Sequence, residues 1–154
     1  MRRVGELIVA VVFGMQMHDL SARTVFDVRA KLEMFGETLR VTIQNGPQES
    51  VPVPTPLVVW RPGVGGVEFK VWTMKGAELH ECAMIDYGPG VQGRVELKPS
   101  GSVTQIFTIA DVLKRNFCLR GGRYFVQAFF HNELDGKELS ETLASNPLIV
   151  EIGT

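Results

Sequence analysis

The sequence predicts an all-β protein in which two antiparallel sheets pack face to face. Apolar and polar residues alternate along 39–45 and again along 67–73. A period of two places all the apolar side chains of a strand on one face, as in a half-buried antiparallel sheet. Sixteen glycines and eight prolines stand mostly between apolar runs, which indicates many short strands joined by turns. With no internal repeat and no linker in the sequence, one domain is expected over residues 25–152.

The first two strands are expected on either side of a tight turn. Residues 25–34 form a mixed strand, Gly36 and Glu37 turn the chain, and residues 39–45 form the clearest alternating strand. An Asn-Gly-Pro step at 45–47 then breaks the strand.

The middle of the chain is expected to cross between the sheets and then form a hairpin. Residues 51–56 carry three alternate prolines, which cannot donate ladder hydrogen bonds, so they predict an edge strand or a polyproline-like crossing. Residues 57–60 begin a further strand, and the alternating segment 67–73 pairs with 78–85. A glycine-rich loop follows at 86–93.

The second half of the chain adds four strands, for a total of seven to nine. They are expected at residues 94–97, 103–109, 124–131 and 148–152. Asp111 is placed to cap one helical turn over residues 111–115. Six side chains from different strands are expected to point into one interior: Leu39, Val41, Ile43, Phe69, Phe107 and Val126.

Residues 1–22 have the layout of a signal peptide. Two arginines follow Met1, residues 7–15 form an apolar run, and Ala22 stands at a plausible cleavage point. The run is too short to span a bilayer of about 30 Å, so no membrane span is expected after cleavage. The alternative is a buried first strand, because residues 7–13 are rich in β-branched side chains. A secreted or periplasmic location is expected, with the cytoplasm as the alternative.

Charge and cysteine content narrow the function classes. The net charge is −1, which gives no basic face for a nucleic acid. Cys82 and Cys118 match no zinc or redox spacing. In an exported protein they are a candidate disulfide that would stabilise the fold by about 3–4 kcal/mol on the chain-entropy model. The alternative is two separate buried thiols.

No motif in the sequence predicts catalysis, a cofactor or a metal site. The chain lacks a His-Glu-x-x-His run, a Gly-x-Ser-x-Gly elbow and a phosphate-binding loop. His80 stands between Glu78 and Glu81, and His131 precedes two acidic residues in the following loop. Neither group supplies a closed set of metal ligands. We therefore expect no enzyme activity, no cofactor and no metal.

Trp72 is the candidate residue for a contact surface. It shares a strand face with Glu68 and Lys70, opposite the apolar stripe of residues 67–71. Tryptophan on an exposed sheet face is typical of a binding hot spot. The alternative is that a neighbouring hairpin or the proline-rich segment covers this face.

A glycine-rich corner leads into the strand that begins at Tyr124. Gly122 precedes the tyrosine, whose ring would fill the end of the sandwich while its hydroxyl bonds to backbone in the corner. Together with residues 39–45, 95–102 and 145–152, this corner resembles bacterial immunoglobulin-like domains. Such domains accompany secreted enzymes or form small proteinase inhibitors. The resemblance covers residues 25–152, although Val126 stands where antibody-type modules carry their second cysteine.

The resemblance implies a binding or structural role. We expect a non-catalytic protein-binding or structural module of the bacterial cell envelope or secreted fraction, with an unidentified protein partner. One alternative is a small proteinase inhibitor that presents loop 86–93. A second alternative is an enzyme with an unrecognised site.

Overall fold

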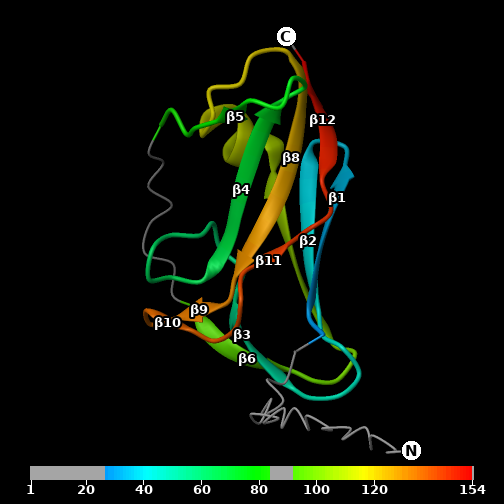
Figure 1. Ribbon diagram of the computed structural model, residues 1–154, viewed down its shortest axis with the longest axis vertical. Helices are drawn as coiled ribbons and strands as arrows, with labels where there is room; N and C mark the ends of the chain where they lie inside the picture. Colours follow the sequence, from blue (N-terminus) through cyan, green and yellow to red (C-terminus); the bar gives the residue numbers. More distant parts are fainter. Residues whose placement is uncertain (1–26, 84–91, 154) are drawn as a thin grey trace, which may run out of the picture.

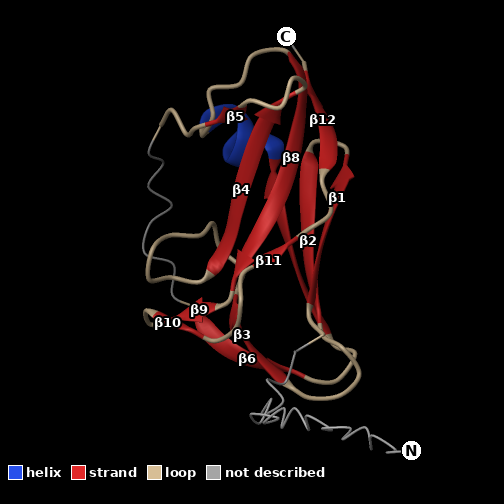
Figure 2. Ribbon diagram, in the orientation of Figure 1, coloured by secondary structure: helices blue, strands red, loops and turns tan. Residues whose placement is uncertain are grey.

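The computed structural model describes residues 27–83 and 92–153 (Figure 1). Within these residues the chain is all-β, with several antiparallel sheets and one short helical segment (Figure 2). The expected signal peptide at 1–22 and most of the loop at 86–93 lie outside the described residues.

The first sheet has three strands. They are β1 (Arg29–Phe35), β2 (Thr38–Gln44) and β7 (Ser102–Thr108), in the order β1-β2-β7 with antiparallel pairing throughout. Gly36 lies in the turn between β1 and β2 with a φ of +58°, which a residue without Cβ adopts readily.

The second sheet is built around the longest strand, β8 (Gly122–His131). On one side β8 pairs with β4 (Gly66–Thr73), which in turn pairs with the two-residue β5 (Glu78–Leu79). On the other side β8 pairs first with β12 (Leu148–Ile152) and, further along, with β11 (Leu143–Ala144). The long strands of the two sheets run along the same molecular axis (Figure 1).

Two small sheets lie at the end of the molecule opposite to the C-terminus (Figure 1). One pairs β3 (Val51–Thr55) with β6 (Gly93–Leu97), and the other pairs β9 (Glu133–Leu134) with β10 (Lys137–Glu138). The prolines at 52 and 54 are tolerated because β3 pairs with a single neighbour, which leaves one side of the strand free of ladder bonds.

One apolar core fills the space between the sheets. The six side chains expected to point inward are all buried, with exposed fractions between 0% and 9%. The alternation along β2 and β4 is therefore the direct cause of the layered fold, since each strand turns its apolar face to the core.

The strands are more numerous and shorter than the sequence predicts. Twelve are present in the described residues, and four of these have only two residues. The expected strand at 57–60 is reduced to a single parallel bridge between Val59 and Val67, because a turn at Arg61–Val64 sends the chain back at once. The hairpin partner expected at 78–85 pairs with β4 only through β5.

The expected helical turn is present, but Asp111 does not cap it: the N-cap position is Ile109, and no side chain caps the segment there. Residues Ala110–Arg115 form one π-helical segment, η1. Asp111 lies inside the first turn, so its carboxylate cannot cap it from outside. Instead the Asp111 backbone N–H donates to Thr108 Oγ1 at 3.3 Å, and the Thr108 hydroxyl donates to the Asp111 carboxylate.

Candidate functional site

Three apolar side chains form a row across the outer face of the second sheet. Trp72 in β4 stands directly opposite Phe125 in β8, and Phe125 stands opposite Ile149 in β12. Directly opposed residues in antiparallel strands point to the same face, so the three side chains lie side by side. Ile149 is 42% exposed, whereas Trp72 and Phe125 are half-buried. We call these three residues the apolar row.

Charged and polar side chains border the apolar row. Glu78 in β5 is the partner of Trp72 on the other side of β4, and its carboxylate lies 4.0 Å from the Lys70 ammonium. The Lys70 ammonium also lies 5.2 Å from the ring centroid of Phe129. An apolar strip with a polar rim is the usual composition of a protein contact patch.

A second cluster gathers around His131 at the end of β8. The imidazole stacks on the Trp60 ring with 4.3 Å between ring centroids, and its Nε2 lies 2.8 Å from a Glu68 carboxylate oxygen. The Thr142 hydroxyl lies 3.3 Å from its Nδ1, and the Trp60 indole N–H donates to Glu133 at 3.3 Å. Residues from three other segments of the chain therefore contact this one ring.

The Thr142 hydroxyl, the His131 imidazole and the Glu68 carboxylate lie in the same order as the nucleophile, the base and the acid that orients the base in a catalytic triad. Catalysis needs, in addition, donors for a developing oxyanion and a cleft that receives a substrate. The described residues bring no three histidine, cysteine, aspartate or glutamate side chains together as a possible metal site. The cluster fixes the end of β8 to its neighbouring loops.

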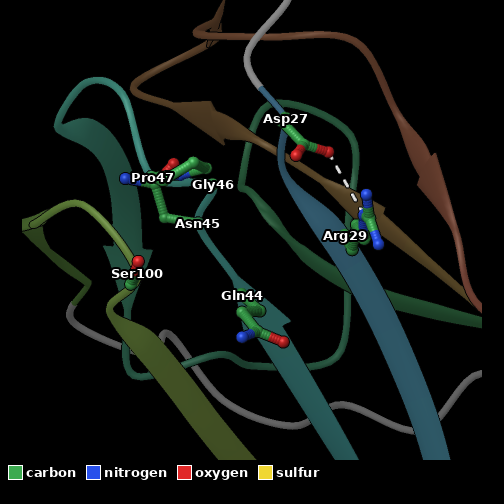
Figure 3. A pocket seen from close by; sticks show the side chains of 7 residues that line it. All are labelled: Asp27, Arg29, Gln44, Asn45, Gly46, Pro47 and Ser100. Carbon is green, nitrogen blue, oxygen red and sulfur yellow. Dashed lines mark hydrogen bonds and ion pairs between the residues drawn. The ribbon is translucent and has the colours of Figure 1, made fainter.

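A shallow hollow of about 300 Å³ lies where the first sheet meets the turns at 45–47 and 98–101 (Figure 3). Its charged wall is an ion pair between Asp27 and Arg29, with 3.2 Å between the guanidinium Nε and the carboxylate. The buried Asn45 amide donates to the backbone carbonyls of Glu49, Leu97 and Lys98. Since this amide is engaged in holding loops, the hollow offers no free amide N–H at Asn45. Its full lining is Asp27, Arg29, Gln44, Asn45, Gly46, Pro47 and Ser100.

A disulfide and a tyrosine hydrogen bond fix the segments that precede β8. The structure joins Cys82 and Cys118 in a disulfide, and the Cys82 N–H donates to the Asn116 carbonyl at 2.8 Å. The Tyr124 hydroxyl donates to the Arg120 carbonyl at 3.0 Å, which closes the corner before β8. Gly122 has a φ of +152°, and a Cβ there would lie 3.6 Å from the tyrosine oxygen.

The other residues singled out in the sequence do not converge. His80 is exposed and follows β5, whereas His131 is the last residue of β8. Of the loop at 86–93, only Gln92 and Gly93 are described, and the Gln92 amide donates to the Gly65 carbonyl at 2.7 Å. The Trp60–His131 stack was missed, since the two residues are 71 positions apart and neither stands in a motif.

No family model matches the chain, and no curated protein matches it either. The described residues contain no helix with the length and apolar character needed to cross a membrane.

Proposed function

We propose that this chain is an immunoglobulin-like domain. In that architecture the first, second, fourth and fifth strands share one sheet, while the third, sixth and seventh share the other. The orders β1-β2-β7 and β12-β8-β4 support this assignment for six of these strands, whereas β6, counted as the fourth, pairs with β3 instead of β7. The bond from the Tyr124 hydroxyl to the Arg120 carbonyl supports it further, because a tyrosine corner opens the sixth strand of many such domains.

The function that we propose is non-catalytic protein binding or a structural role in the bacterial cell envelope or secreted fraction. The observation that carries it is the alignment of Trp72, Phe125 and Ile149 on one sheet face. Aromatic side chains in such a position supply most of the binding energy at protein contacts.

An exported location supports this role. Disulfides persist in oxidising compartments and are rare in the cytosol, so the Cys82–Cys118 bond favours export. The signal-like residues 1–22 favour it independently.

A comparison of two single substitutions tests the binding proposal. Ile149→Asp places a charge in the apolar row, and Phe35→Asp places the same charge on the other sheet at a similar exposure, 50% against 42%. In a pull-down from the native envelope fraction, we expect a partner that is retained by the wild type and by Phe35→Asp and is lost with Ile149→Asp. Equal retention by all three proteins would reject the apolar row as the contact surface.

A further inference from the structure

We propose that a second copy of this chain pairs with the free edge of β7, which joins two three-stranded sheets into one six-stranded sheet. β7 is the last strand of the first sheet, and no described strand pairs with its second side. This inference goes beyond the binding role of the apolar row, because it concerns the opposite sheet and a different partner.

The backbone groups on the free side of β7 can be assigned from the ladder to β2. The Asn45 N–H donates to the Gly101 carbonyl at 2.8 Å, and the Ile109 N–H donates to the Glu37 carbonyl at 2.9 Å. Hydrogen-bonded pairs alternate along an antiparallel ladder, so the odd-numbered residues of β7 bond to β2. The N–H and C=O groups of the even-numbered residues therefore point away from the sheet. These residues are Ser102, Thr104, Ile106 and Thr108.

The edge of β7 carries no charge, no proline and no side chain from another segment bonded to its backbone, unlike the other strand edges. Proteins protect sheet edges with charges, prolines, very short strands or covering groups. At the other end of the same sheet, the backbone of Leu32 is covered by the Asn146 side chain. In the remaining sheets, β3 contains two prolines, β6 contains Arg94 and Glu96, and β5 has two residues. β12 contains Glu151. β7 has seven residues without a charge, a proline or a glycine.

The sequence of β7 suits pairing with itself. A two-fold axis at Gln105 places Thr104 opposite Ile106 of the partner subunit and Ser102 opposite Thr108 of the partner subunit. Counted with their two-fold equivalents, these are four pairs of even-numbered residues, so the outward N–H and C=O groups of the two strands face each other. Val103 then stands opposite Phe107 of the partner subunit on the inner face. No charge lies near the axis, where it would meet its own copy.

Exposure at the edge also favours this partner. Ile106 is 53% exposed, the largest fraction among the exposed large apolar residues of the described chain. The Ile106 carbonyl receives only a 3.3 Å contact from the neighbouring Gln105 side chain. Pairing would replace this contact with backbone hydrogen bonds and cover Ile106 with a threonine from the partner strand.

The oligomeric state of the purified full chain tests the proposal. Sedimentation equilibrium over a range of concentrations is expected to show a reversible dimer. Ile106→Lys brings two like charges to within about 7–8 Å across the axis and is expected to raise the dissociation constant at least ~10-fold. Phe35→Lys is the matched control, since Phe35 is 50% exposed and lies on β1, at the far edge of the sheet. It is expected to leave the dissociation constant unchanged.

A cysteine placed on the axis tests the register independently. In a non-hydrogen-bonded antiparallel pair the Cα atoms are about 4.5 Å apart, which a disulfide can span. Because the two native cysteines are bonded to each other, Gln105→Cys introduces the only free thiol. Mild oxidation of Gln105→Cys is expected to give a covalent dimer, whereas Thr104→Cys, displaced diagonally from its copy, is expected to give little.

Three outcomes would overturn the proposal. The first is a wild-type protein that stays monomeric at its highest soluble concentration, and the second is a dimer unaffected by Ile106→Lys. The third is a monomeric full chain that dimerises once residues 1–26 are removed, because the N-terminal segment would then be the occupant of the edge.

Discussion

The side-chain amide of Asn146 is bonded to both backbone groups of Leu32, which lies 114 positions earlier in the chain. The Leu32 N–H donates to Asn146 Oδ1, and Asn146 Nδ2 donates to the Leu32 carbonyl, both at 2.9 Å. The preceding residue, Ser145, is bonded to Ala128 of β8 through its N–H and its hydroxyl. Two successive residues thus bond to two different sheets, which links β1 at the edge of the first sheet to β8 in the middle of the second.

Asn146→Ala is expected to lower the free energy of unfolding by about 1–3 kcal/mol, because it leaves both backbone groups of Leu32 without their partner. Asn146→Asp is expected to do no better, since a carboxylate cannot donate to the Leu32 carbonyl. Urea unfolding monitored by circular dichroism measures both changes. Gln48→Ala is the control, as Gln48 is exposed. If Asn146→Ala unfolds at the wild-type midpoint, the link between the sheets has no energetic importance.

Tyr124→Phe is expected to lower the free energy of unfolding by about 0.5–1.5 kcal/mol, the typical net contribution of one hydrogen bond. The ring stays in place, so only the bond from the hydroxyl to the Arg120 carbonyl is lost. Thermal unfolding measures the change. A melting temperature equal to that of the wild type would argue against a stabilising tyrosine corner.

Loss of the Cys82–Cys118 disulfide is expected to lower the free energy of unfolding by about 3–4 kcal/mol on the chain-entropy model, given its sequence separation of 36. The double variant Cys82→Ser/Cys118→Ser should match the reduced wild-type protein in a urea titration. A reducing agent should have no effect on the double variant, which provides the control. A wild-type midpoint that does not respond to the reducing agent would contradict a stabilising disulfide.

Local sequence patterns predicted the interior of the sandwich well. Leu39, Val41 and Ile43 alternate with polar residues, and all three are fully buried. The prediction succeeds here because a period of two is a property of one strand, independent of its neighbours. The turn at Gly36 could also be predicted locally, because glycine readily adopts the positive φ that this turn requires.

Contacts between distant segments could not be predicted in this way. Residues 145–147 lead into the last expected strand, but nothing in them indicates Leu32 as the partner of Asn146. The same holds for Trp60 and His131, whose stack depends on how two loops pack. Asp111 was expected to cap the helical turn, but the turn begins before it, and the residue at which a turn begins could not be read from the sequence.

His131→Ala is expected to lower the free energy of unfolding by about 1–3 kcal/mol, because it removes the Trp60 stack and the contact with Glu68. His80→Ala is the matched control, since His80 is exposed, and it is expected to change stability little. Near-ultraviolet circular dichroism of the folded variants should report the altered surroundings of Trp60 only for His131→Ala. Equal effects of the two substitutions would show that the cluster has no special role.

Gly65→Ala tests how tightly the loop before β4 is packed against β9. Gly65 is buried, and a Cβ there would lie 1.9 Å from the Glu133 carbonyl oxygen and 2.9 Å from the Glu133 nitrogen. Backbone atoms cannot rotate away as a side chain can, so β9 or the loop must shift. We expect a loss of about 2–3 kcal/mol in the free energy of unfolding.

Gly153→Ala is the control, because a Cβ there meets nothing within 4 Å. Since Glu133 also accepts the Trp60 indole N–H, the shift should change Trp60 fluorescence in the folded protein as well. Wild-type stability and fluorescence in Gly65→Ala would show that this close approach is absent in solution.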